Sequence, residues 1–273
     1  MIRGSTKLYP IIGFPVSQVR APSVYNPYFE RKGIDAIVVP IEVSPHLFPE
    51  YLKTMLTASN IPGAMVTVPH KLATVNVLDD YSKAVRVAGA CNAVLRRPDG
   101  TLYGDLFDGA GFVRGLKRWG VEPSGMRCLI VGTGGVGAAI AASLADGGVQ
   151  SITLSDLRAV SADALADRLR KFHPDLDVRV GPSDVAGYDL VVNGTPLGMK
   201  PDDPLPFELH NLSPSTLVAD AVMKPDMTRL LREARARGCK IQLGREMLFE
   251  QAPLYLEFFG FGPVSSDELR PEL

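Results

Sequence analysis

The chain has 273 residues, a length that suggests about two domains, and 46% of them are apolar against 22% charged, the balance of a globular protein. Its formal net charge of −1 gives no general electrostatic case for binding nucleic acid or an anionic membrane. The N-terminus lacks the apolar core of a signal peptide and no stretch approaches a membrane span, so a cytoplasmic location is expected.

Strands and helices alternate along the first part of the chain, which predicts a mainly parallel sheet covered by helices. The expected strands are 8–14, 36–43 and 64–68, followed by a hairpin of 91–96 with 102–104. The expected helices are 23–32, 45–58, 71–78 and 80–87.

A helix over residues 108–119 is expected to connect this part to a second one, which begins near Met126. Strands are expected there at 128–131, 152–154, 189–193, 217–221 and 240–243. They alternate with helices expected at 138–145, 162–172, 228–237 and 247–259, and the polar end at 265–273 is expected to fray. The sequence therefore predicts an α/β protein.

The cysteines and histidines do not indicate a disulfide framework or a metal site. The three cysteines are widely separated and form no C-x-x-C pair, and the four histidines lack the spacing of metal ligands. The expected partner is a small-molecule substrate, with the chain acting as a monomer or homodimer.

A dinucleotide fingerprint follows the apolar run at 128–131. Glycines stand at the spacing G-x-G-x-x-G, before an alanine-rich helix, a second strand and an acidic residue. Such glycines permit a tight turn, close approach of a pyrophosphate and close packing of the helix, whose N-terminus binds the phosphates. A glycine-rich turn can be merely structural, but here every part of the unit occurs in order. The candidate cofactor-binding glycines are Gly132, Gly134, Gly135 and Gly137.

Asp156 stands just past the second strand of this unit. A carboxylate there accepts hydrogen bonds from the adenosine ribose, which favours NAD, and it would repel the 2′-phosphate of NADP. Arg158 could partly offset that repulsion. The alternative is that Asp156 only caps the next turn.

Polar residues gather where ligands of open α/β sheets bind, at the carboxyl ends of strands. Thr67 and Lys71 follow one strand, and Asn92 and Asp108 occur in later loops. Lysine and aspartate are suited to moving a proton to or from a hydroxyl group. The alternative is that Lys71 starts a surface helix and Asp108 caps the connecting helix, and the spacing alone leaves both open.

The chain resembles the shikimate dehydrogenases over nearly its whole length. Residues 63–71, GAMVTVPHK, resemble the family's G-x-N-V-T-x-P-x-K motif, and 89–92, GACN, resemble G-A-x-N. Residues 104–109, GDLFDG, resemble G-x-N-T-D-G, and 193–199, NGTPLGM, resemble N-A-T-P-x-G-M. Gly244 with Met247 and Gln251 resembles the final motif.

The resemblance implies a substrate domain of residues 1–108, completed by 245–273, and a Rossmann domain of residues 109–244, with a cleft between them. It implies that Lys71 and Asp108 form the catalytic pair. It implies that substrate hydroxyls are held by Thr67, Asn92 and Gln251, and that the nicotinamide end of the cofactor is contacted by Thr195, Gly244 and Met247. The cofactor expected is NAD, with NADP less favoured.

Several residues depart from the family pattern. The two serines of the first substrate loop, which bind a carboxylate in the family, are Val19 and Ala21 here, with Arg20 between them. Other polar positions are replaced by Met65, Leu106, Phe107 and Met223, and the N-R-T that grips the NADP phosphate is replaced by 155–157, SDL. The substrate's acid end and the cofactor phosphate site therefore differ from the family, while the proton-transfer pair is kept.

Two alternatives to a shikimate dehydrogenase-like enzyme are considered. One is a methylenetetrahydrofolate dehydrogenase-like enzyme, which also has an N-terminal α/β domain and a catalytic lysine. The other is a catalytically idle nucleotide-binding sensor. The G-A-x-N and final Q-A motifs argue against the first, and the retained Lys71 and Asp108 argue against the second.

Overall fold

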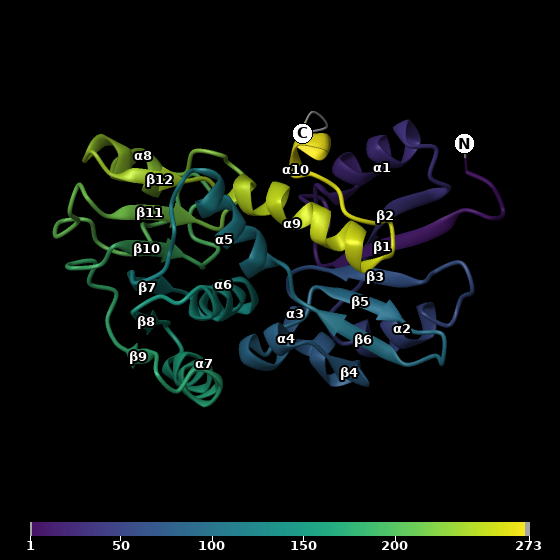
Figure 1. The fold of residues 1–273 in the computed structure, drawn as a ribbon, viewed down its shortest axis with the longest axis horizontal. Coiled ribbons are helices and arrows are strands. Elements are labelled where there is room, and N and C mark those ends of the chain that lie inside the picture. Colours follow the sequence, from purple (N-terminus) through teal and green to yellow (C-terminus); the bar gives the residue numbers. More distant parts are fainter. Residues whose placement is uncertain (1, 271–273) are drawn as a thin grey trace. The chain divides into compact units, whose positions relative to one another are not determined.

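The computed structural model describes residues 2–270, which divide into two compact units. The first unit comprises Met1–Phe107 with Ala252–Leu273, and the second comprises Asp108–Gln251. Both contain a six-stranded sheet with helices (Figure 1). Within residues 2–270, no helix combines the length and the apolar character that crossing a membrane requires.

The sheet of the first unit has the strand order β2-β1-β3-β5-β6-β4. Its first three strands pair in parallel, β3–β5 and β5–β6 pair antiparallel, and β4 pairs in parallel with β6. The strands are β1 (Lys7–Gly13), β2 (Ala36–Glu42), β3 (Gly63–Val66), β4 (Asp80–Tyr81), β5 (Ala93–Arg96) and β6 (Leu102–Asp105). The helices are α1 (Ala21–Arg31), α2 (Phe48–Met55), α3 (Lys71–Thr74), the 3₁₀ turn η1 (Val75–Val77), α4 (Lys83–Ala88) and α10 (Ser266–Leu269).

The sheet of the second unit is parallel throughout, in the order β12-β11-β10-β7-β8-β9. Its strands are β7 (Arg127–Val131), β8 (Ser151–Ser155), β9 (Asp177–Val180), β10 (Leu190–Asn193), β11 (Leu217–Asp220) and β12 (Lys240–Gln242). Its helices are α5 (Asp108–Arg118), α6 (Gly135–Asp146), α7 (Ala159–Phe172) and α8 (Arg229–Ala236). Counted in chain order the strands run 3-2-1-4-5-6, which is the Rossmann order and confirms the predicted fold class.

The helix α9 (Gly244–Phe258) is divided between the units: its residues up to Gln251 belong to the second, and those from Ala252 to the first. Tyr255 in its last turn, and Phe259 directly after it, belong to the apolar core of the first unit with Tyr25 and Phe29 of α1. One buried apolar cluster of the second unit includes Leu129 of β7, Val218 of β11 and Leu231 of α8.

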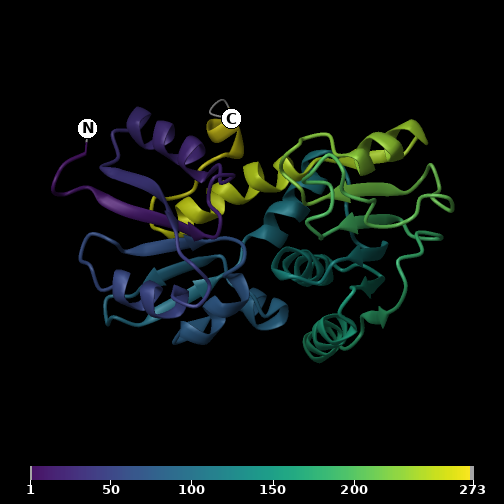
Figure 2. The ribbon, with the colours of Figure 1, turned by 180° about the vertical axis from the view of Figure 1, so that it is seen from behind.

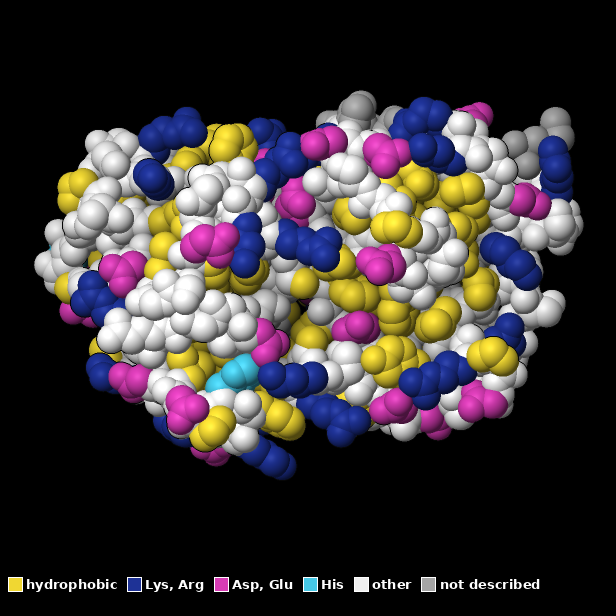
Figure 3. Space-filling model, in the orientation of Figure 1, with side chains coloured by type: hydrophobic (Ala, Val, Ile, Leu, Met, Phe, Trp, Pro, Cys, Tyr) yellow, Lys and Arg dark blue, Asp and Glu magenta, His cyan; other side chains and the backbone are white. Residues whose placement is uncertain are grey.

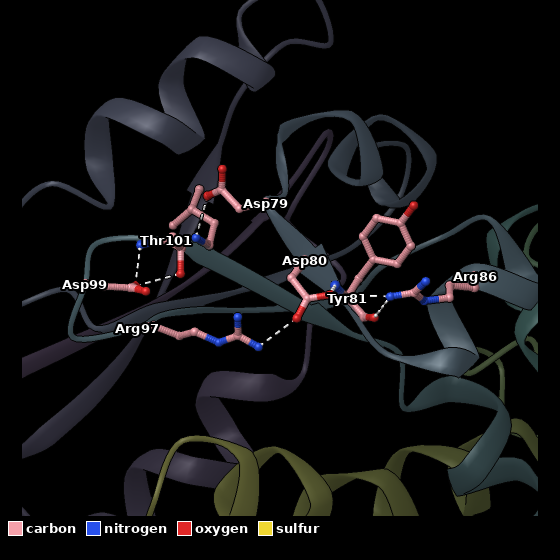
Figure 4. A network of polar contacts seen from close by, with 8 residues as sticks. Asp79, Asp80, Tyr81, Arg86, Arg97, Asp99 and Thr101 are labelled. Carbon is pink, nitrogen blue, oxygen red and sulfur yellow. Dashed lines mark hydrogen bonds and ion pairs between the residues drawn. The ribbon is translucent and has the colours of Figure 1, made fainter.

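One predicted helix, 80–87, is wrong at its start, because Asp80 and Tyr81 form β4 and the helix begins only at Lys83. Polar side chains from the neighbouring hairpin and from α4 contact this strand. Figure 4 shows Arg97 donating to Asp80 at 2.9 Å, and Arg86 approaching the same carboxylate at 3.5 Å. Ser82 then caps α4 by accepting from the Val85 N–H. A two-residue strand has no hydrophobic period, so the sequence pattern could not reveal it.

Two further differences lie at exposed edges. Strand β9 was not predicted, because only Val178 of its four residues is buried and the alternation is too short to stand out. The end of the chain was expected to fray, but Ser265 caps α10 and Glu268 forms an ion pair with Lys32 at 2.8 Å. The helix α10 therefore lies against α1 (Figures 1 and 2), and residues 271–273 lie outside the described residues.

Charged side chains of both signs are interspersed over the surface. On the face drawn in Figure 3, Lys and Arg lie among Asp and Glu, as the net charge of −1 leads one to expect.

Candidate active site

Three of the predicted site residues come together in the first unit, at the carboxyl end of β3. Thr67 directly follows this strand, and its N–H donates to the Ile12 carbonyl of β1 at 2.8 Å. The Asn92 carbonyl accepts from the last residue of β3, Val66, at 2.8 Å, and the Cys91 N–H donates to the Lys71 carbonyl at 2.9 Å. The backbone therefore places Thr67, Lys71 and Asn92 around one end of the sheet.

Lys71 is the first residue of α3, yet it is not a surface residue. Its exposed fraction is only 7%, whereas lysines are almost never buried without a partner. The alternative of a lysine that merely begins a surface helix is therefore wrong.

His70 shapes the corner that carries Lys71, a role that the sequence did not reveal. Its imidazole stacks on Phe48, with ring centroids 4.1 Å apart and an interplanar angle of 3°, and its Nε2 lies 2.8 Å from the Val43 carbonyl. Burial lowers the pKa of His70, against the raising effect of the Val43 and Gly13 carbonyls. The neutral ring therefore anchors the backbone that precedes Lys71 through its contacts with Phe48 and Val43.

Asn92 has one side-chain group in use and one free. Its Oδ1 accepts from the Phe107 N–H at 3.0 Å, and its carbonyl also accepts from the Tyr255 hydroxyl at 3.2 Å. Its Nδ2 is buried without a hydrogen-bond partner among the described residues. A buried donor left unpaired costs free energy, so this amide is suited to a ligand oxygen.

Three of the positions that depart from the family pattern, Ala21, Met65 and Phe107, form part of the apolar core of the first unit. Phe107 packs edge-on against Tyr255, with centroids 5.0 Å apart, and against Phe258 at 5.5 Å. Met65 and Ala21 belong to the same buried cluster. Arg20 stands at the N-cap of α1, half-buried, and its guanidinium has no ion-pair partner among residues 2–270.

In the second unit the glycines of the fingerprint surround the N-terminus of α6. Gly132 has φ +93°, and a Cβ on Gly137 would lie 1.8 Å from the Gly132 carbonyl oxygen. By contrast, a Cβ on Gly134 would meet no atom within 4 Å. Gly134 is also the N-cap of α6 and offers no side-chain cap to the helix N–H groups, of which Gly135 carries the first. Open space before a helix N-terminus without a capping side chain fits the pyrophosphate of a dinucleotide.

Two alanine substitutions should separate packing from binding in this loop. We expect Gly137→Ala to lower the free energy of unfolding by about 3 kcal/mol, the upper end of the usual cost of overpacking. Gly134→Ala should leave stability nearly unchanged but weaken binding of a reduced nicotinamide cofactor by about tenfold or more, because its methyl group fills the open space. Thermal unfolding and nicotinamide fluorescence measure the two effects. Tight binding by a folded Gly134→Ala protein would contradict the assignment.

Asp156 reaches back from β8 to the glycine loop. One carboxylate oxygen accepts from the Thr133 N–H at 2.7 Å and from its hydroxyl at 2.8 Å, and the other accepts from the Arg158 N–H at 2.9 Å. Burial raises the pKa of Asp156, but the hydrogen bonds from Thr133 and Arg158 together outweigh burial and hold the pKa below its ordinary value. Asp156 therefore does cap the turn, and of about four acceptor positions on a carboxylate it keeps one for a ligand.

The remaining predicted residues of the second unit lie on two packed helices and one loop. A Cβ on Gly111 of α5 would meet the Met247 carbonyl of α9 at 2.5 Å and Gln251 at 2.7 Å, so these helices are in close contact. Asp108 opens α5 with an exposed fraction of 2%, and Gln251 Oε1 is buried without a partner among the described residues. Gly244, at the start of α9, would clash with the Val222 carbonyl if it carried a Cβ.

Comparisons with known proteins agree with this architecture. Residues 11–94 match the family model of the shikimate dehydrogenase substrate binding domain. The chain is 37% identical to a shikimate dehydrogenase (NADP(+)) of Acidiphilium cryptum, over 98% of this chain and 96% of that one.

Solved structures match over the same extent. A quinate dehydrogenase from Corynebacterium glutamicum in complex with NAD superposes with a TM-score of 0.86 at 29% identity, covering 98% of both chains. A 5-ketofructose reductase from a Gluconobacter strain superposes with a TM-score of 0.86 at 27% identity, covering 98% of this chain and 97% of that one. The chain therefore belongs to the shikimate dehydrogenase family, as a nicotinamide-dependent oxidoreductase that acts on CH–OH groups.

Proposed function

We propose that the protein oxidises a hydroxyl group of a small alicyclic polyol or polyol acid with NAD, or reduces the corresponding ketone. The observation that carries the proposal is Lys71, a buried lysine at the same strand end as Thr67 and the unpaired Nδ2 group of Asn92. Membership of a family of dehydrogenases makes proton transfer the natural role for that lysine.

In the proposed reaction Lys71 takes the proton of the reacting hydroxyl, or returns it in the reverse direction. Asp108, buried at the start of α5, orients the lysine and the hydroxyl. When bound, the nicotinamide cofactor supplies the hydride chemistry. The unpaired Nδ2 of Asn92 would donate to one substrate oxygen, and the unpaired Oε1 of Gln251 would accept from another hydroxyl, with Thr67 as a further ligand.

In the cofactor site the glycine loop of residues 132–137 would hold the pyrophosphate at the N-terminus of α6. Thr195, Gly244 and Met247 would contact the nicotinamide end. The direct test of the whole proposal is a panel of shikimate, quinate and related polyol acids with NAD and NADP, following the absorbance of the reduced nicotinamide. No turnover of any polyol or ketone with either cofactor would contradict it.

A second candidate substrate class is an uncharged polyol ketone. The positions of two carboxylate-binding serines hold Val19 and Ala21, and Phe107 and Met65 extend the apolar character of the first unit. A solved relative is named 5-ketofructose reductase, so the architecture hosts a reductase for a ketose. An uncharged ketose belongs in the same panel.

The proposed preference for NAD rests on Asp156, since a carboxylate beside the glycine loop repels a 2′-phosphate. We expect a higher kcat/KM with NAD than with NADP. Asp156→Asn should shift the ratio toward NADP by removing the negative charge. Equal or better efficiency with NADP in the unmodified protein would contradict the preference.

Arg158 provides the matched control, because its Nε lies 3.9 Å from the Asp156 carboxylate and partly offsets the charge. Arg158→Gln should move the ratio in the opposite direction and strengthen the preference for NAD. A change in the same direction for both variants would show that loop disruption, rather than charge, sets the ratio.

A further inference from the structure

A buried network of hydrogen-bonded polar side chains extends from the loop after β10 to the N-terminus of α8. The Asn193 Oδ1 accepts from the Thr195 N–H at 3.0 Å and from its hydroxyl at 2.6 Å. The Asn193 Nδ2 donates to Asp220 Oδ1 at 3.0 Å and to the Leu197 carbonyl at 2.9 Å. The Thr228 hydroxyl donates to Asp220 Oδ2 at 2.7 Å. The other members of this network, Asn193, Asp220 and Thr228, are each at most 1% exposed.

The carboxylate of Asp220 and the Leu197 carbonyl are the two acceptors that orient the Asn193 amide, and the carboxylate is the charged one. An ionised carboxylate only accepts hydrogen bonds, so it requires the NH₂ group of Asn193 on its side. The carbonyl oxygen of the amide must then face Thr195, where two donors converge on it. The Val222 N–H also donates to Asp220 Oδ1, at 2.9 Å, so the acceptor is itself fixed to the backbone that follows β11.

The loop that this network holds, residues 194–195, lies directly against the dinucleotide fingerprint. A Cβ on Gly132 would lie 2.7 Å from the Thr195 methyl group and 2.8 Å from the Thr195 nitrogen. A Cβ on Gly194 would lie 2.8 Å from the Gly132 carbonyl oxygen. The ends of β7 and β10 thus touch where a parallel sheet binds its ligands, and small movements of residues 194–195 alter that surface.

We infer that Asp220 is a positioning residue of the cofactor site, acting through Asn193 to hold Thr195 in the orientation that receives the nicotinamide end. The inference rests on the proposed function, which gives Thr195 that place.

The buried charge of Asp220 lowers the stability of the fold. Burial raises the pKa of Asp220 to about 6, although the hydrogen bonds from Thr228, Val222 and Asn193 lower it. These three partners are neutral. On the adjoining segments Lys224 is exposed, Asp226 pairs with Arg245 at 2.7 Å, and Arg229 pairs with Glu233 at 2.8 Å. A buried carboxylate without a cation destabilises the fold relative to a neutral group, so its value lies in being an acceptor of fixed direction.

The test compares two ligands that differ only at the nicotinamide end. Asp220→Ala should weaken binding of NADH by about tenfold, measured by nicotinamide fluorescence, while binding of ADP-ribose, measured by calorimetry, changes by less than about twofold. Asp220→Asn can keep an oxygen toward Asn193 and Val222 and should restore NADH binding to near the unmodified value. If Asp220→Ala does not fold, Asp220→Ser is measured with the same expectation.

Thr228→Ala is the matched control, because Thr228 caps α8 and contacts Asp220 but not Asn193. It should lower the melting temperature and leave the ratio of NADH to ADP-ribose affinity unchanged. Unchanged NADH binding by Asp220→Ala or Asp220→Ser, or an equal loss for both ligands, would overturn the inference alone. Failure of the unmodified protein to bind reduced cofactor of either kind would overturn the proposed function and this inference with it.

Discussion

Replacing Lys71 by alanine is expected to lower kcat by about 10²–10⁴-fold, the usual contribution of a positioned acid–base group. Lys71 is 7% exposed, and the only function proposed for its ammonium is to move the proton of the reacting hydroxyl. Binding of the reduced cofactor should be unchanged, because the glycine loop that holds it belongs to the second unit. Steady-state kinetics on the best substrate of the panel, with cofactor fluorescence alongside, measure both quantities.

Two further variants make the Lys71 result specific. Asp108→Asn should also lower kcat, because an amide cannot orient the ammonium as a carboxylate does. Lys53→Ala removes an exposed lysine of α2 from the same unit and should have no effect on kcat. If both Lys71→Ala and Asp108→Asn turn over normally, neither residue has the catalytic role proposed for it.

The inner strands β7, β10 and β11 of the second unit could be predicted from the sequence because they are almost wholly buried. Each of these strands contains a run of apolar residues, and the glycine spacing indicated that β7 leads directly into α6. Strands β4 and β9 could not be predicted, because they lie at the sheet edges and are held by side-chain contacts such as Arg97 with Asp80 rather than by a hydrophobic pattern.

The sequence could predict those site residues whose place follows from the end of a strand. It could not predict contacts with side chains that are distant in the sequence. Thr67 and Lys71 follow a strand end, and this position is visible in the sequence. The stacking of His70 on Phe48 and the hydrogen bonds from Thr133 to Asp156 connect residues more than twenty positions apart. Only the folded chain brings such partners together, which is why Asp156 was expected to bind a ribose or cap a turn but not to brace the glycine loop.

Shikimate is expected to be a poor substrate with a high KM. A carboxylate that enters a partly dry site loses its hydration and needs donors in exchange. Val19 is half-buried and Ala21 is buried at the first position of α1, and neither side chain has a donor. Each lost hydrogen bond to a charged group costs about 1.5–3 kcal/mol, so the loss of two weakens binding by roughly two to four decades if nothing compensates.

Restoring both hydroxyls, as Val19→Ser with Ala21→Ser, should therefore lower the KM for shikimate. The control is the uncharged ketose of the panel, whose KM should not fall in the same variant because it has no carboxylate to receive the new donors. A KM for shikimate that stays unchanged in the double variant would show that the loop is not where the acid end binds.

Arg20 is the group that could compensate, since its guanidinium can bind a carboxylate through two parallel hydrogen bonds. It stands between the two altered positions, half-buried and without an ion-pair partner among residues 2–270, so its charge is available to a ligand. Phe107 and Met65 share a buried apolar cluster with Ala21 and favour the opposite outcome, in which the substrate carries no charge at that end. Arg20→Ala distinguishes the two outcomes. If the substrate carries no charge at that end, the variant should keep the high KM for shikimate and should turn over an uncharged substrate normally. A low micromolar KM for shikimate in the unmodified protein, abolished by Arg20→Ala, would show instead that the arginine has replaced both serines.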